Sequence, residues 1–175
     1  AQLALLQDGG DEEALREGLL ALFKQTLAPD DLKAYIARFP DFDDEEAQDE
    51  ALDWAEKKGS LLKASRLFVA LGQRERAARA LVNRSDEIKG AYRRDYLEIA
   101  DLLQDKHPLA AALIFRKFVE IAVSLSNAYD YQEAALYFLA LAEMDRHIDD
   151  YEGHATHSVF ADYMRSEYRL NSSFW

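Results

Sequence analysis

Apolar residues recur at steps of three and four along most of the chain, and this periodicity constrains the fold more than any other feature of the sequence. Near the start, for example, Leu15, Leu19 and Phe23 fall on one face of a helix. No stretch shows the alternation of apolar and polar residues that is typical of a strand. The sequence therefore predicts an all-α protein.

Proline, glycine and capping residues divide this pattern into separate segments. Pro29 and Pro108 each fit the first turn of a helix, whereas Pro40 ends one because its ring cannot continue the hydrogen-bond ladder. Gly59 is expected to close a helix in the left-handed conformation. The expected helical segments span residues 11–27, 29–39, 43–58, 60–71, 73–83, 93–104, 108–127, 131–147 and 156–168.

Two of these segments differ from the rest in their apolar pattern. Residues 108–127 carry two apolar stripes, which predicts a central helix with neighbours on both sides. Residues 131–147 are apolar nearly all round, so we expect this helix to be the most enclosed. Since the connections are short, successive helices should be antiparallel neighbours.

Short helical pairs with alanine at their contacts favour an array of helical hairpins, an α-solenoid. The stretches 67–78 and 128–135 resemble the junction between the two helices of a tetratricopeptide repeat. Ala77 and Ala111 are 34 residues apart, which is the period of that repeat, but Ala134 follows after only 23, so the repeats are irregular. We expect an irregular tetratricopeptide-like stack of about eight helices.

We expect this stack to be a single α-helical domain over residues 1–175. Its first part, residues 1–58, forms acidic helices, and residues 60–175 form repeat-like pairs and a closing helix. The chain also looks like the C-terminal part of a longer repeat protein.

Several blocks of the C-terminal half resemble an uncharacterised family of bacterial helical-repeat proteins. The blocks are residues 106–116, Asp150-Tyr151, His157, residues 163–165 and Phe174-Trp175, and together they cover roughly residues 60–175. Residues 168–171 read Tyr-Arg-Leu-Asn, where that family usually has a basic block, which weakens an anion-binding role. The resemblance implies a cytoplasmic bacterial protein with an all-helical fold, and it implies no activity.

Composition excludes several classes of function. The chain has no cysteine and only seven glycines, which excludes disulfides, thiol catalysis and a glycine-rich phosphate loop. Its 33 acidic and 21 basic residues give a net charge of −12, which repels nucleic acid and anionic membranes. The longest apolar run, residues 134–142, is well short of the roughly 20 residues that a membrane span needs. We expect no catalytic residues, no cofactor and no membrane contact.

The histidine-rich stretch 144–157 holds the only candidate metal ligands, His154 and His157. Their spacing does not place both on one helical face, because that requires a step of four. We expect no metal here and interpret His157 as a residue of the first turn of the last helix, with His154 facing solvent.

A second set of candidates combines arginine with tyrosine. Five residues could grip a peptide in a groove between the helices, and they are Arg93, Arg94, Tyr96, Arg116 and Tyr131. The alternative for the tyrosines is packing in the core. Arg116 lies on an apolar helix, so its charge should find an acidic partner inside the fold or line a concave surface.

These observations favour a non-catalytic module that binds a protein or peptide on a concave helical surface. One alternative is a capping segment of a larger repeat protein, which a polar, unbroken outer face on the last helix would favour. Another is phosphate or nucleic-acid binding through the basic stretch Arg74–Arg94. A homodimer is possible, because a truncated array exposes an apolar end. We also expect Phe174 and Trp175 to fold back onto the last helix.

Overall fold

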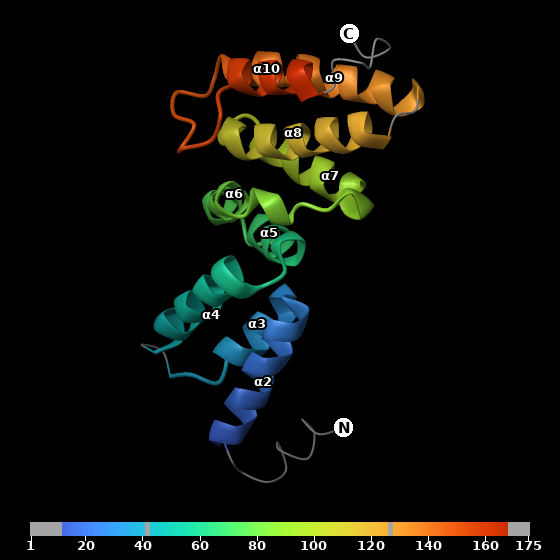
Figure 1. The fold of residues 1–175 in the computed structure, drawn as a ribbon. Coiled ribbons are helices and arrows are strands. Elements are labelled where there is room, and N and C mark those ends of the chain that lie inside the picture. The colour runs from blue at the N-terminus through green and yellow to red at the C-terminus, as the bar shows by residue number, and fades with distance from the viewer. Residues whose placement is uncertain (1–11, 41–42, 126–127, 168–175) are drawn as a thin grey trace. The chain divides into compact units, whose positions relative to one another are not determined.

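The computed structural model describes residues 12–40, 43–125 and 128–167. Within these ranges the chain forms nine α-helices, two short 3₁₀-helices and no strand (Figure 1). The prediction of an all-α fold is confirmed, and each of the nine segments expected from the sequence corresponds to one of these helices, in agreement with the expected number of about eight. Phe174 and Trp175 lie outside the described ranges. The contacts group into two units, residues 1–80 and 81–175, each of which is described by itself.

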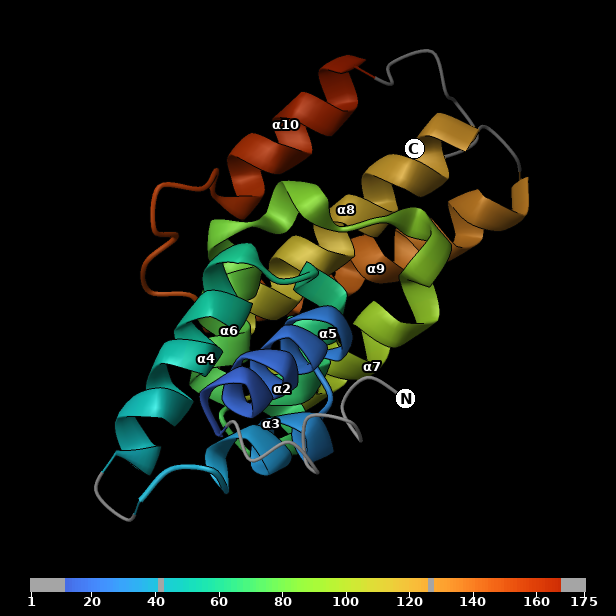
Figure 2. The ribbon, with the colours of Figure 1, turned by 90° about the horizontal axis from the view of Figure 1, so that it is seen from below.

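The first unit begins with three helices, α2 (Glu12–Thr26), α3 (Pro29–Ile36) and α4 (Asp44–Lys58). Helix α2 packs against α3, and α3 packs against α4 (Figure 2). The predicted stripe on α2 is buried in this packing, since Leu15, Leu19 and Phe23 are all inaccessible to solvent or nearly so. Helix α5 (Leu61–Ala70) and the first part of α6 (Arg74–Asn83) complete the unit.

Gly59 follows α4 but does not adopt the left-handed conformation, so that prediction is wrong. Its φ and ψ are −68° and 165°, which any residue can adopt. The position still requires glycine, because a Cβ atom would lie 2.8 Å from the Ala55 carbonyl oxygen and 2.8 Å from Leu27 Cδ1. The left-handed residues near here are Gly72 after α5, with φ 73°, and Leu27 after α2, with φ 53°. Close approach of the backbone, rather than a special φ, explains Gly59.

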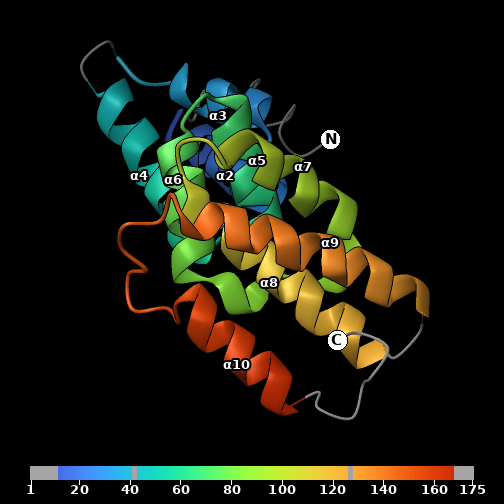
Figure 3. The same ribbon diagram turned by 90° about the horizontal axis from the view of Figure 1, so that it is seen from above.

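The second unit is built around helix α8 (Pro108–Leu125). Two 3₁₀-helices, η1 (Ser85–Glu87) and η2 (Gly90–Tyr92), lead into α7 (Arg93–Leu103), and α7 packs on α8. Helix α9 (Ala128–Asp145) packs along the other side of α8, as Figure 3 shows. A loop of eleven residues then leads to α10 (His157–Glu167), which contacts α9. The prediction of a central helix at 108–127 is confirmed, because Ile114, Phe118 and Val119 are fully buried.

Helix α9 is not the most enclosed helix, contrary to the prediction. Leu136 is 65% exposed and Leu139 is 69% exposed, whereas Leu141 on the same helix is only 1% exposed. The sequence places apolar residues on every side of this helix, but α8 and α10 contact only part of its circumference. An apolar face therefore remains open on α9, and α8 takes the enclosed position.

No helix in the described ranges combines the length and the apolar character that a membrane crossing requires.

Candidate functional site

Two arginines of the predicted basic stretch, Arg76 and Arg79, lie in the first unit and are held by carboxylates. Arg76 Nη1 lies 2.6 Å from Asp53, and its Nη2 lies 3.0 Å from Asp49. Arg79 donates two hydrogen bonds to the buried carboxylate of Glu56, at 2.5 and 3.0 Å. Hydrogen bonds from Arg76 and then Lys57 lower the pKa of Asp53. These charges are already compensated within the fold, which leaves less of the predicted basic stretch for a phosphate.

The arginines of the predicted basic stretch that lie in the second unit, Arg84, Arg93 and Arg94, are paired as well. Arg84 binds Glu87 through two hydrogen bonds, at 2.8 and 2.7 Å. Arg93 forms a 2.7 Å ion pair with Glu133, which joins the start of α7 to α9. Arg94 pairs with a glutamate one turn further along α7 and is 90% exposed in its side chain. Of the three arginines predicted to bind a partner, Arg94 therefore has the most exposed side chain.

The structure does not gather the five predicted partner-binding residues on one exposed face. Tyr96, Arg116 and Tyr131 are buried, whereas Arg93 is partly exposed and Arg94 projects into solvent. The Tyr96 ring packs against Phe118, and burial, with a smaller effect of a nearby glutamate, raises the pKa of Tyr96 to about 12. Both tyrosines therefore occupy the position of core residues, which was the alternative left open for them.

Arg116 joins α8 to the loop before α10. Its Nη1 donates a 2.5 Å hydrogen bond to the Ala155 carbonyl oxygen, and its guanidinium carbon lies 5.2 Å from the ring centroids of both Tyr151 and Phe160. The side chain is buried, and desolvation lowers its pKa. Within the described part of the chain no carboxylate lies within ion-pair distance of it, and its Nε–H has no hydrogen-bond partner. The Tyr151 side chain accepts a further hydrogen bond from it, and the charge of Asp145 acts on it at longer range. Arg116 is thus a buried cation without a bound carboxylate.

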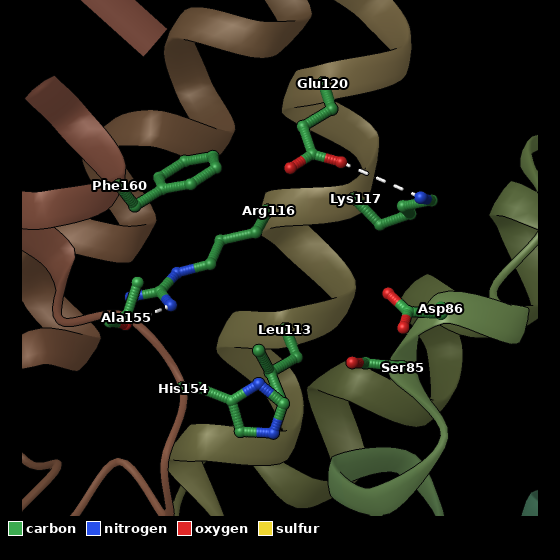
Figure 4. Close-up of a pocket in the computed structure, with 9 residues that line it drawn as sticks. All are labelled: Ser85, Asp86, Leu113, Arg116, Lys117, Glu120, His154, Ala155 and Phe160. Carbon is green, nitrogen blue, oxygen red and sulfur yellow. Dashed lines mark hydrogen bonds and ion pairs between the residues drawn. The ribbon is translucent and has the colours of Figure 1, made fainter. Parts of the chain in front are cut away.

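A pocket of about 190 Å³ opens beside this arginine; we call it the Arg116 pocket. It lies between η1, α8, the loop before α10, and α10 itself. Its lining residues are Ser85, Asp86, Leu113, Arg116, Lys117, Glu120, His154, Ala155 and Phe160 (Figure 4). The sequence pattern did not point to Asp86 or Glu120 as members of a site, because η1 and α8 are brought together only by tertiary packing.

The two candidate metal ligands take separate roles. His154 Nε2 lies 3.1 Å from the Val82 carbonyl oxygen, so this nitrogen carries the proton. The His157 ring packs 5.2 Å from Phe138, its Nδ1 is buried without a partner, and desolvation lowers its pKa. Over the residues that the structure describes, no three histidine or carboxylate side chains converge as metal ligands would.

The open side of α9 is a second feature of the second unit. It consists of Ala135, Leu136, Leu139 and Ala142, which lie on one face at helical spacing; we call it the α9 leucine face. The neighbouring helix α10 exposes Val159 and Tyr163, at 55% and 47%. The all-round apolar pattern of α9 was the signal for this face, but the pattern alone does not reveal which side stays uncovered.

Fold and sites together define an all-α helical protein with a buried arginine beside a pocket and an open apolar helix face. The chain belongs to DUF6880, a family of unknown function, whose model matches residues 1–175. The match is wider than the resemblance over residues 60–175. No curated protein and no solved structure matches the chain.

Proposed function

We propose that the chain is a non-catalytic protein-binding module, and that its partner is a basic amphipathic helix that docks on the α9 leucine face. The observation that supports this most is the exposure of Leu136 and Leu139, at 65% and 69%. Large apolar side chains that share one helix face in water mark a docking surface more often than isolated ones do. Burying such side chains stabilises a complex by roughly 25 cal/mol for each Å² removed from water.

The dimensions of the face favour a helical partner. It runs from Ala135 to Ala142, which is about 10 Å or two turns at about 1.5 Å per residue. Alanines flank the leucines, and small side chains at a contact allow two helices to approach to about 8 Å. A partner helix with apolar residues on one face would place its own side chains beside the two leucines.

The negative charge around this face favours a partner helix with basic residues along its edges. Residues 121–175 hold nine acidic and three basic residues, a net charge of −6. Glu143 on α9 and Asp162 on α10 have side chains that are 63% and 77% exposed, and each forms an ion pair with an arginine one turn further along the chain. Both ion pairs are exposed to solvent and contribute little to stability, so a basic partner can replace them. Lysine or arginine at the edge of a partner helix would meet these carboxylates and speed association.

A second copy of the chain fits this face less well, because its own residues 121–175 also carry a net charge of −6 and would be repelled. A stable interface usually buries about 800 Å² on each partner. Two leucines and two alanines supply only part of that area, so a homodimer would need further contacts. The partner we propose has the same need, and Val159 and Tyr163 on α10 offer it more apolar surface.

The other candidate functions receive less support. A capping role would be favoured by a polar, unbroken outer face on α10, but Val159 and Tyr163 interrupt that face. Binding of phosphate or nucleic acid through the stretch Arg74–Arg94 has to compete with the carboxylates that already pair with its arginines.

The repeat-like architecture and the cytoplasmic, bacterial setting are also proposals. The resemblance over residues 60–175 supports all three, and the packing of α7, α8 and α9 in sequence order agrees with an array of hairpins. The absence of cysteine from the sequence agrees with a reducing compartment.

The test has two stages, both with the 175-residue chain. Affinity capture from the source organism first recovers partners of the wild-type chain. Each purified partner is then titrated against wild type, the double variant Leu136→Glu/Leu139→Glu, and the control Leu102→Glu. Leu102 is a suitable control because it is 44% exposed on α7 of the same unit.

We expect the double variant to bind at least tenfold more weakly and the control to bind like wild type. A recovered partner that binds all three chains equally would contradict docking at α9. Failure to recover any partner that distinguishes the wild type from the double variant would contradict it as well.

A further inference from the structure

The guanidinium of Arg116 is held by the Ala155 carbonyl oxygen and by the Tyr151 side chain, but one of its N–H groups has no partner. Nη1 is bound to Ala155, and the rings of Tyr151 and Phe160 lie 5.2 Å from its central carbon. The Nε–H has no hydrogen-bond partner, and water cannot supply one because the residue is only 6% exposed. A buried N–H of a charged group is costly when it is left unsatisfied. An acceptor that enters the adjoining Arg116 pocket would remove that cost.

The pocket has charges of both signs on different walls. Arg116 reaches from α8 toward Ala155 on one side, and Asp86 with Ser85 lies on the opposite side (Figure 4). Glu120 lies between these two sides, and Lys117 extends toward the side of Asp86 (Figure 4). Lys117 and Glu120 are joined by a long ion pair of 3.7 Å. The charges of the two cations and two carboxylates in the lining sum to zero. A ligand that carries only a negative charge would therefore gain little electrostatic stabilisation from the pocket as a whole.

The size of the pocket limits its ligand. A water molecule takes about 30 Å³ in the liquid, so about 190 Å³ holds a molecule of roughly six non-hydrogen atoms or a few more. Leu113 and Phe160 add apolar surface to the lining. A small molecule with a carboxylate, an ammonium group and a short apolar part would match the size and both charges.

We propose that the Arg116 pocket binds a small zwitterion of the α-amino acid class. Its carboxylate accepts a hydrogen bond from Arg116 Nε, and its ammonium group donates to Glu120 and to Asp86 on the opposite side of the pocket. Hydrogen bonds between charged groups are roughly twice as strong as neutral ones, and both ends of the ligand form them. Desolvation raises the pKa of Glu120, and a cationic ammonium beside this carboxylate would favour its ionised form. The proposal does not depend on partner binding at α9.

The test is calorimetric titration of the 175-residue chain with glycine, L-alanine and L-serine. L-Alaninamide, which lacks the carboxylate, and propionate, which lacks the ammonium group, are the matched controls. We expect at least one of the three amino acids to bind saturably, and both controls to bind at least tenfold more weakly.

Substitutions of lining residues test whether the amino acid binds in the Arg116 pocket. Arg116→Gln and Asp86→Asn should each weaken binding of the best amino acid at least tenfold, and Lys106→Ala, an exposed residue outside the lining, should not. If Arg116→Gln does not fold, Asp86→Asn and Glu120→Gln decide the question, since both side chains reach solvent.

Three results would overturn the proposal. These are the absence of saturable binding of any of the three amino acids, binding of propionate as tight as that of the best amino acid, and equal binding by wild type and Asp86→Asn. A calorimetric readout is independent of any activity of the protein, and also of the partner titrations.

Discussion

At the scale of single residues, Tyr96 links burial to pH dependence. Its hydroxyl is neutral when protonated, and burial raises its pKa to about 12, from a usual value of 10. Between these values the unfolded chain loses the proton and the folded chain keeps it. The unfolded state then binds fewer protons, so the free energy of unfolding must fall as pH rises through this window.

We therefore predict that replacing Tyr96 with phenylalanine reduces the alkaline loss of stability. The free energy of unfolding, measured in urea at about pH 9 and about pH 11, should fall by about 1 kcal/mol less in Tyr96→Phe than in wild type. Because Tyr35 and Tyr151 also have raised pKa values, the comparison between the two proteins is required. An identical fall in both would show that the Tyr96 hydroxyl titrates normally.

Gly59 provides a second test at this scale. A Cβ atom there would press on the Ala55 carbonyl oxygen, which is backbone and cannot rotate away. Gly59→Ala should lower the free energy of unfolding by about 1–3 kcal/mol. At Gly72 a Cβ atom would meet nothing within 4 Å, and only the positive φ is unfavourable, so Gly72→Ala should cost about 1 kcal/mol. Chemical denaturation of both variants checks the order, and a larger loss at Gly72 would contradict the steric explanation.

For Arg116, the sequence predicts that the charge needs partners but not which groups those are. Its position on an apolar helix correctly indicates that the charge needs compensation. The groups that compensate it, Ala155, Tyr151 and Phe160, lie 35–44 residues further along the chain, on the loop and helix that follow α9. No local pattern identifies them, because they meet Arg116 only when that loop folds back over α8.

At the scale of the elements, helix α9 has two sides of opposite character. Replacing Leu136 and Leu139 together by lysine should change the free energy of unfolding by less than about 0.5 kcal/mol, because both side chains are already in water. Leu141→Lys should cost about 3 kcal/mol or more, because that position is buried and offers the ammonium no partner. Urea unfolding of the two variants measures the difference. A large loss in the double variant would show that the α9 leucine face is covered in the folded chain.

Helix ends that proline or glycine marks could be predicted more reliably than helix environments. Ends without such a residue are predicted less well, since the helix expected at residues 131–147 spans Ala128–Asp145. Pro29 and Pro108 begin α3 and α8 as expected, and α4 ends at Lys58 before Gly59. These signals are local, since they depend on what proline and glycine do to their own backbone. The exposure of α9 depends on which elements reach it, and apolar periodicity holds no information on that.

At the scale of the whole molecule, charge governs long-range interactions. The net charge is −12, and most arginines of the stretch Arg74–Arg94 are paired with carboxylates. We predict that the chain passes through a heparin column without retention at about 0.1 M salt. Retention that falls steeply with added salt would instead support the phosphate-binding alternative.

The enclosed position of α8 has a consequence for how the second unit opens. Its amides can exchange with solvent only when α7 and α9 move away, because both pack along it. Hydrogen–deuterium exchange should therefore be slowest in the middle of α8, around Ile114 and Phe118, and should follow global unfolding there. The second unit would lose its outer helices first and keep its centre to the last.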